Sequence, residues 1–247
     1  MPEQPHEPIV PQRALVIVAH PDDAELACGA TVATWTASGA QVWTCIVTDA
    51  SGGGDDHAED VGPAARAAIS AMRKAEQRAA CDALGQAGAL FLDYPDGRIE
   101  PTLELRRDIV RVIRQLQPEI IITQSPDRRW DPFFLFRHHP DHLAVGAAVM
   151  AAVYPAARNS WDFPELLDEG LKPHRVQELW ISAAPVVNHW VDVTAGVDAK
   201  IAALRAHHSQ LGPRMDELAT NIRRWLAENG ARYGVGAAEE FHRADLR

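Results

Sequence analysis

Two clusters of histidine and aspartate contain the side chains of this sequence that are best suited to chemistry. The first, Ala19-His20-Pro21-Asp22-Asp23, comes at the end of an apolar run, and the second is His138-His139-Pro140-Asp141-His142. Imidazole nitrogens and carboxylate oxygens are the ligands that zinc takes in catalytic sites, where three protein ligands leave one position for water. The clusters therefore predict a divalent metal site with further groups left for proton transfer.

One division of the roles follows from these residue types. His20, Asp23 and His142 would supply two imidazoles and one carboxylate as metal ligands. Asp22 would stand beside the metal without binding it. A metal-bound water still needs a base to accept its proton as it attacks, and Asp22 suits that task.

The second cluster has the sequence pattern of a helix start. Pro140 fits the first helical position, and Asp141 suits the positive end of the helix dipole. His139 lies three residues before His142, so the two project from one face of such a helix. We predict that His139 stabilises an oxyanion or donates a proton to a leaving amine, and that Asp141 orients an imidazole.

The elements that must position these clusters alternate along the chain. The predicted strands are Ala14–Ala19, Gln41–Thr48, Ala89–Leu92, Glu119–Thr123, Val176–Ser182 and Trp190–Val193. The predicted helices are Glu25–Ser38, Ala64–Leu84, Pro101–Leu116, Pro140–Ala152, Val197–His208 and Met215–Asn229, and Tyr154–Pro173 is predicted to be a loop. Continuous apolar runs rich in Val and Ile are typical of parallel strands covered on both faces. The pattern predicts an α/β fold, a Rossmann-like three-layer sandwich with a mostly parallel central sheet.

This topology would bring the two clusters together. In open α/β sheets, ligands bind beyond the carboxyl ends of the strands, where the strand order reverses. In the common order 3-2-1-4-5, the first and fourth strands are neighbours at that point. The first cluster directly follows the first strand, and the second follows the fourth strand after a loop, so we expect them to face each other.

Composition excludes several classes of protein. The 247 residues have a net charge of -10, which argues against nucleic acid as a partner. Residues 1–13 are predicted to form a flexible N-terminal tail, and residues 14–247 a single domain. The start lacks the pattern of a signal peptide, and the apolar stretch 146–153 is too short to span a membrane. We therefore expect a cytoplasmic protein without a membrane partner.

The two clusters also carry a family resemblance. The strand ending in Ala-His-Pro-Asp-Asp, followed by Cys28-Gly29-Ala30-Thr31 and much later by the histidine motif 139–142, resembles the PIG-L/LmbE-like zinc de-N-acetylases. The likeness extends over roughly residues 14 to 212 and includes the runs 73–85, 91–97 and 200–210. It implies removal of acetyl from an N-acetylglucosamine-type sugar conjugate, with Zn²⁺ as cofactor. Fe²⁺ also suits N and O ligands, and the family is compatible with a homo-oligomer.

The resemblance implies roles for individual residues. His20, Asp23 and His142 would be the zinc ligands, Asp22 the general base, and His139 the catalytic histidine that assists the tetrahedral intermediate.

Substrate-contacting residues are implied less directly. Arg73 and Asp96 fall where family members place such residues. In the loop 125–137, Trp130 could stack on a sugar face and Arg137 could bind an anionic group, or the loop could be a subunit contact. Arg137 and the pair Ala50-Ser51 depart from the family pattern, so the sequence leaves the sugar conjugate open.

Two alternatives remain at this point. A related metal-dependent amidase could cut a larger conjugate with the same residues. A non-catalytic receiver-like α/β domain would use the acidic pair for Mg²⁺ with oxygen ligands only, but would leave the histidines without a role. His207 and His208, late in the chain, would either line the pocket or close a helix.

Overall fold

The centre of the molecule is a seven-stranded sheet. The computed structural model describes residues 9–131 and 135–247, and for Phe136 and Arg137 it describes the backbone alone. The strand order is β3-β2-β1-β4-β5-β7-β6. The strands are β1 (Arg13–Val18), β2 (Gln41–Thr48), β3 (Gly88–Tyr94), β4 (Ile120–Gln124), β5 (Glu178–Ser182), β6 (His189–Asp192) and β7 (Ala238–Asp245). Strands β1 to β5 pair in parallel, whereas β7 is antiparallel to both β5 and β6.

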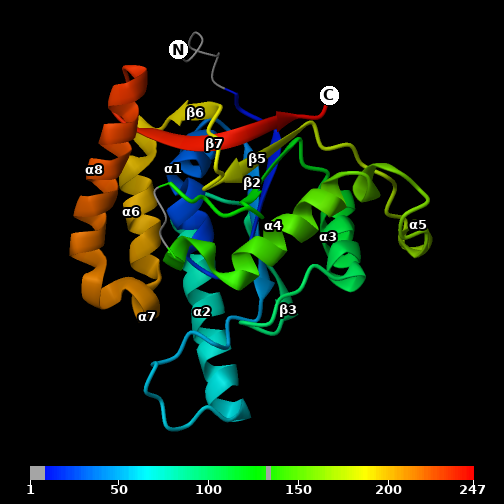
Figure 1. The fold of residues 1–247 in the computed structure, drawn as a ribbon, viewed down its shortest axis with the longest axis horizontal. Helices are drawn as coiled ribbons and strands as arrows, with labels where there is room; N and C mark the ends of the chain where they lie inside the picture. The colour runs from blue at the N-terminus through cyan, green and yellow to red at the C-terminus, as the bar shows by residue number, and fades with distance from the viewer. Residues whose placement is uncertain (1–8, 132–134) are drawn as a thin grey trace.

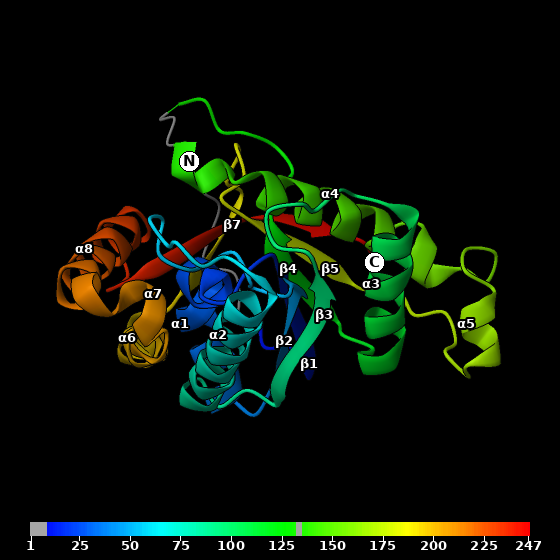
Figure 2. The ribbon, with the colours of Figure 1, turned by 90° about the horizontal axis from the view of Figure 1, so that it is seen from below.

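Helices cover both faces of this sheet. The α-helices are α1 (Asp23–Ala37), α2 (Pro63–Ala83), α3 (Leu103–Leu116), α4 (Pro140–Val153), α5 (Glu165–Asp168), α6 (Val197–Ala206), α7 (His208–Leu211) and α8 (Met215–Tyr233). Short 3-10 helices are η1 (Leu135–His138), η2 (Ala156–Arg158), η3 (Thr194–Gly196) and η4 (Gly212–Arg214). Helices α1, α2, α6 and α8 lie on one side of the sheet, with α3 and α4 on the other (Figures 1 and 2). The predicted three-layer α/β fold is confirmed.

The apolar runs are continuous because each central strand is buried on both faces. Along β1, Val16 and Val18 pack into the apolar cluster beneath α1, and Leu15 and Ile17 pack into the cluster beneath α3 and α4. Successive side chains of a strand point to opposite faces, so both sets must be apolar here.

The predicted elements were right in kind, with three differences. Strand β7 was not predicted, because its sequence Ala-Glu-Glu-Phe-His-Arg-Ala-Asp is mostly polar. The expected loop 154–173 contains η2 and α5. The helix expected to run to His208 ends at Ala206, and His207 separates it from α7.

The topology brings the two histidine clusters together as expected. Strand β1 pairs with β4, so the segments that follow them leave the sheet side by side. The side-chain oxygen of Gln124, the last residue of β4, accepts a hydrogen bond from the Ala19 amide at 3.0 Å. Helix α4 approaches this point closely at Gly146, where a Cβ atom would lie 2.4 Å from the Gln124 carbonyl oxygen.

Residues 1–8 of the predicted tail lie outside the described residues. The next residue, Ile9, accepts a hydrogen bond from the Trp35 indole through its carbonyl group. Within the described ranges, every helix is too short or too polar to cross a bilayer. The division into a tail and one domain stays a prediction.

Candidate active site

Three side chains from both clusters converge at the carboxyl ends of β1 and β4. His20 Nδ1 lies 3.2 Å from His142 Nε2 and 3.4 Å from Asp23 Oδ2, and His142 Nε2 lies 3.2 Å from Asp23 Oδ1. Ligand atoms that surround zinc tetrahedrally at their usual bond lengths are about 3.3 Å apart. The three donor groups predicted as ligands thus have the mutual spacing of a metal-ligand set.

The other nitrogen of His20 faces two carboxylates. His20 Nε2 lies 3.2 Å from Asp141 Oδ2 and 3.1 Å from Asp96 Oδ1. With its proton on Nε2, the imidazole donates toward these oxygens and keeps the Nδ1 lone pair directed at His142 and Asp23. Carboxylates fix the tautomer and orientation of metal-binding histidines in this way.

Asp141 is itself held rigidly by the backbone. Its carboxylate accepts hydrogen bonds from the amides of Gly97, at 2.8 Å, and Ile99, at 3.1 Å, and the side chain is buried. Burial opposes ionisation, but the hydrogen bonds from His20 and these amides outweigh it and lower the pKa of Asp141. The imidazole that Asp141 contacts is that of His20, in the other cluster.

The electrostatics of the site favour positive charge. Burial alone would lower the pKa of His20, but hydrogen bonds to Asp141, Asp23 and Asp96 raise it to about 11. Burial of Asp96 opposes ionisation, yet its contact with His20 brings its pKa down to about 2. Carboxylates arranged in this way stabilise positive charge at the His20 ring. Either a proton on the ring or a divalent metal bound to it would provide that charge.

Asp22 has an unusual backbone and a perturbed carboxyl group. It has φ 86°, in the left-handed region, and its side chain is 16% exposed. Burial and the neighbouring Asp23 carboxylate raise the pKa of Asp22 to about 7, against the attraction of the Arg73 guanidinium. Arg73 Nη2 lies 3.8 Å from Asp22 Oδ2. A carboxyl group with such a pKa can exchange protons near neutrality.

His139 borders the same site as the N-cap of α4. The Asp141 amide donates to His139 Nδ1 at 3.2 Å, so the neutral ring has its proton on Nε2. The ring centroid lies 4.9 Å from that of His20 and 5.3 Å from that of His142. Burial and these two rings lower the pKa of His139. The residue itself is exposed, so substrate can reach it.

The predicted substrate residues have different environments. Arg73 and Asp96 are buried beside the site, and Gly52 donates its amide to Asp96. Trp130 is 73% exposed. The side chain of Arg137 lies outside the described residues. The substrate roles of all four stay predictions.

A buried chain of side chains lies behind Asp22, and the sequence did not indicate that its members contact one another. Its members are Glu25, Gln77 and His207, each 0% exposed. Gln77 lies four residues after Arg73, so the two share one face of α2. That spacing could have indicated that Gln77 lies near the site, but nothing in the sequence linked Gln77 to His207.

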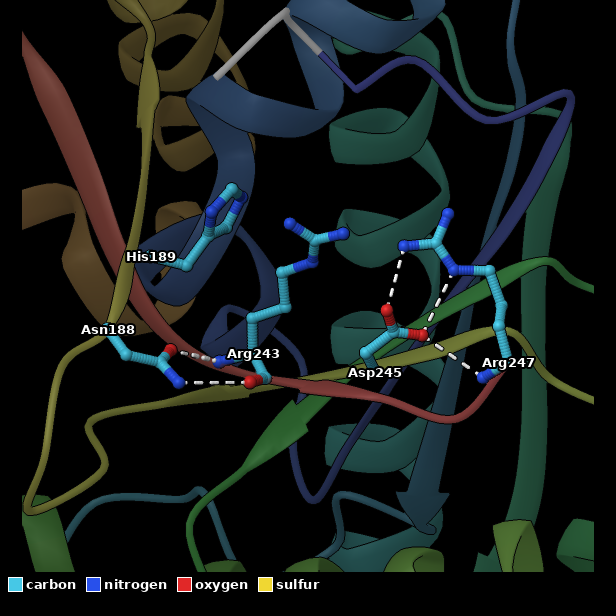
Figure 3. Close-up of a pocket in the computed structure, with 5 residues that line it drawn as sticks. All are labelled: Asn188, His189, Arg243, Asp245 and Arg247. Carbon is cyan, nitrogen blue, oxygen red and sulfur yellow. Dashed lines mark hydrogen bonds and ion pairs between the residues drawn. The ribbon is translucent and has the colours of Figure 1, made fainter. Parts of the chain in front are cut away.

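A separate hollow lies along β7, beside the start of β6 (Figure 3). It is lined by Asn188, His189, Arg243, Asp245 and Arg247. Arg243 makes two bonds to Glu178, and Arg247 pairs with Asp245. Because these charges are paired within the chain, the hollow does not point to a ligand.

Known proteins resemble this chain in sequence and in fold. The family model described as GlcNAc-PI de-N-acetylase matches residues 15–153, more than half of the chain. Diacetylchitobiose deacetylase of Thermococcus kodakarensis is 30% identical, over 91% of this chain and 82% of the relative. The 1D-myo-inositol 2-acetamido-2-deoxy-alpha-D-glucopyranoside deacetylase of Rhodococcus jostii is 28% identical, over 81% of this chain and 82% of the relative. The solved N,N'-diacetylchitobiose deacetylase of Pyrococcus horikoshii has the same fold, with a TM-score of 0.81 and 23% identity, covering 95% of this chain and 84% of that one. The family match and these relatives show that the chain belongs to the PIG-L family of de-N-acetylases.

Proposed function

We propose that this protein is a metal-dependent hydrolase that removes the N-acetyl group from an N-acetylglucosamine-type sugar conjugate. The observation that carries the proposal is the convergence of His20, Asp23 and His142 directly beside Asp22, a carboxyl group with a pKa near neutrality. Two imidazole donors distinguish this site from a magnesium site with oxygen ligands alone.

We propose His20 Nδ1, His142 Nε2 and the Asp23 carboxylate as the metal ligands. Nitrogens of His20, His139 and His142 also lie close enough together to hold a metal. We favour Asp23 over His139 because Asp23 is buried at 3.2–3.4 Å from both nitrogens, whereas His139 Nδ1 accepts the Asp141 amide. Zn²⁺ and Fe²⁺ both suit such a set. A bound metal would supply a Lewis acid that lowers the pKa of water and polarises a carbonyl group.

The neighbouring side chains account for the proton transfers. Asp22 accepts a proton from the attacking water as the C–O bond forms. His139, with its proton on Nε2, donates a hydrogen bond to the tetrahedral intermediate. As the C–N bond breaks, the proton held by Asp22 passes to nitrogen, and acetate and the free amine of the sugar are released.

The substrate class is supported by the names of the relatives, which denote N-acetylated aminosugars. We propose that this chain acts on a substrate of the same class. A larger amide conjugate, cut by the same residues, is the alternative outcome of the test below.

The first experiment combines metal analysis with an assay of amine release. The purified chain, supplied with Zn²⁺ or Fe²⁺, is given N-acetylglucosamine, diacetylchitobiose and the inositol glycoside named above. We expect one metal per chain and amine release that stops on chelation and returns when the metal is restored. Metal binding without deacetylation of any of these sugars would shift the proposal to another amide. Turnover that survives complete metal removal would contradict it.

Substitution of Asp141 by Asn tests whether its carboxylate orients His20 for metal binding. The Asp141 carboxylate accepts hydrogen bonds both from His20 Nε2 and from backbone amides. The Asn side chain has only one oxygen, so its NH₂ group would face either His20 Nε2–H or a backbone N–H, and two donors would oppose each other. We expect Zn²⁺ affinity to fall by about 10–100-fold, measured by competition with a chelating indicator. Asp192→Asn, at an exposed aspartate on β6, is the control and should leave the affinity unchanged. An Asp141→Asn variant with normal affinity would show that His20 needs no such support.

A further inference from the structure

Three buried side chains connect the late histidine motif to the peptide group before Asp22. His207 Nε2 lies 3.2 Å from Glu25 Oε2, Gln77 Nε2 lies 2.8 Å from Glu25 Oε1, and Gln77 Oε1 lies 3.3 Å from the Asp22 amide nitrogen. The residues come from α2, from α1 and from the junction between α6 and α7. All three side chains are completely buried, so bulk solvent does not reach them.

The direction of each hydrogen bond is determined by its neighbours. Asp22 N–H can only donate, so Gln77 must turn its oxygen toward it and its NH₂ group toward Glu25. Glu25 can accept from Gln77 on one oxygen and from His207 N–H on the other. Within the described residues, His207 Nδ1 has no hydrogen-bond partner. His207 thus orients Glu25, and Glu25 orients the Gln77 amide.

Helix α2 holds both ends of a single peptide group at this point. The Arg73 guanidinium donates to the Pro21 carbonyl at 3.1 Å, and Gln77 accepts from the Asp22 N–H of the same peptide. Asp22 adopts φ 86°, a conformation that is strained for a non-glycine residue and persists only where surrounding groups enforce it. Rotation of this peptide would change φ of Asp22 and move its carboxyl group relative to Asp23 and Arg73, the charged groups beside it.

We propose that Gln77, held by Glu25 and His207, is a positioning residue that keeps the Asp22 carboxyl group in place for proton transfer. This inference rests on the proposed function, in which Asp22 is the base. It gives the His207 motif a role that neither alternative from the sequence contained: His207 acts through Glu25 and Gln77 rather than by contact with substrate.

Gln77→Met tests the inference, because Met has a similar shape and cannot hydrogen-bond to the amide or to Glu25. We expect kcat to fall by about 10²-fold, the usual cost of a misplacement near 1 Å. KM and the zinc content should stay within a factor of two or three, since no metal ligand changes. The assay is run well below the unfolding temperature of the variant.

Two comparisons separate positioning from a loss of stability. Thr36→Val removes the hydrogen bond from Thr36, on α1, to the carbonyl of Leu84, at the end of α2. This bond joins α1 to α2, as the contact between Glu25 and Gln77 does, but it lies far from the site. The substitution should lower the unfolding temperature but leave kcat unchanged. In the second, Gln77→Met is combined with Asp22→Asn. If Gln77 acts through Asp22, the double variant should be no slower than Asp22→Asn alone.

The same variants distinguish failure of the positioning role of Gln77 from failure of the proposed role of Asp22 as base. If Asp22→Asn retains turnover, the assignment of Asp22 as base is wrong and the inference fails with it. If Asp22→Asn is inactive but Gln77→Met keeps its kcat, only the inference is overturned. Additive losses in the double variant would also overturn it, because they would show that Gln77 affects the reaction independently of Asp22.

Discussion

Replacement of Asp22 by Asn is expected to reduce kcat by about 10²–10⁴-fold, the usual contribution of a positioned acid or base. Asn has nearly the shape of Asp and tolerates the left-handed backbone that Asp22 adopts at φ 86°. The proposed ligands are unchanged. The folded variant should therefore bind one metal per chain and lose only the group that accepts the proton. Asp22→Ala is a less clean test, because Ala disfavours this backbone conformation.

The measurement is steady-state amine release, together with metal content and thermal unfolding of the same samples. Asp93→Asn is a matched control, since Asp93 also has a positive φ, at 60°, but it lies at the surface of β3 and pairs with Lys74. The control should retain full turnover. Turnover near the wild-type rate in Asp22→Asn, with metal bound, would remove Asp22 from the mechanism.

The second large effect concerns stability, at the buried ion pair between Lys200 and Glu239. Both side chains are 0% exposed, and their charged atoms lie 2.6 Å apart. Glu239 also accepts hydrogen bonds from the amides of Ala30 and Thr31, just beyond the point where α1 departs from helical geometry at Cys28. It serves as the cap for the second part of this helix. Removal of one partner leaves a buried charge without compensation.

Glu239→Ala is expected to lower the free energy of unfolding by about 3–5 kcal/mol, a large share of the total of about 5–15 kcal/mol for a typical protein. Urea unfolding followed by circular dichroism measures it. Asp198→Ala, which breaks the exposed pair with Arg223, should change stability by less than about 1 kcal/mol. The double variant Lys200→Met, Glu239→Leu should recover much of the loss. A Glu239→Ala variant as stable as the Asp198 control would show that the ion pair and the cap contribute little.

Most of the fold could be predicted from the sequence because its central strands are buried on both faces. Such strands must be continuous apolar runs, and those of β1 and β4 are unmistakable. The parallel topology then placed two motifs from distant parts of the chain at one edge of the sheet. For this reason the sequence alone was enough to predict that His20, Asp23 and His142 lie together.

Other features depend on contacts between distant segments and are therefore invisible in the sequence. Strand β7 contains Glu239, whose charge looks like that of a surface residue until Lys200 is seen to pair with it in the core. In the same way, the sequence suited Asp141 to orient an imidazole without indicating which one, and the structure pairs it with His20, in the other cluster.

The sequence by itself therefore determined the fold class, the joining of the two histidine clusters and the chemical types of the donors. The tertiary structure decided which carboxylate contacts which imidazole, which nitrogen of His20 is available, and what holds Asp22 in its left-handed conformation. The reason is physical. Burial patterns repeat along the chain with the period of each element, whereas the partner of a buried polar group is set by packing between elements and leaves no local pattern.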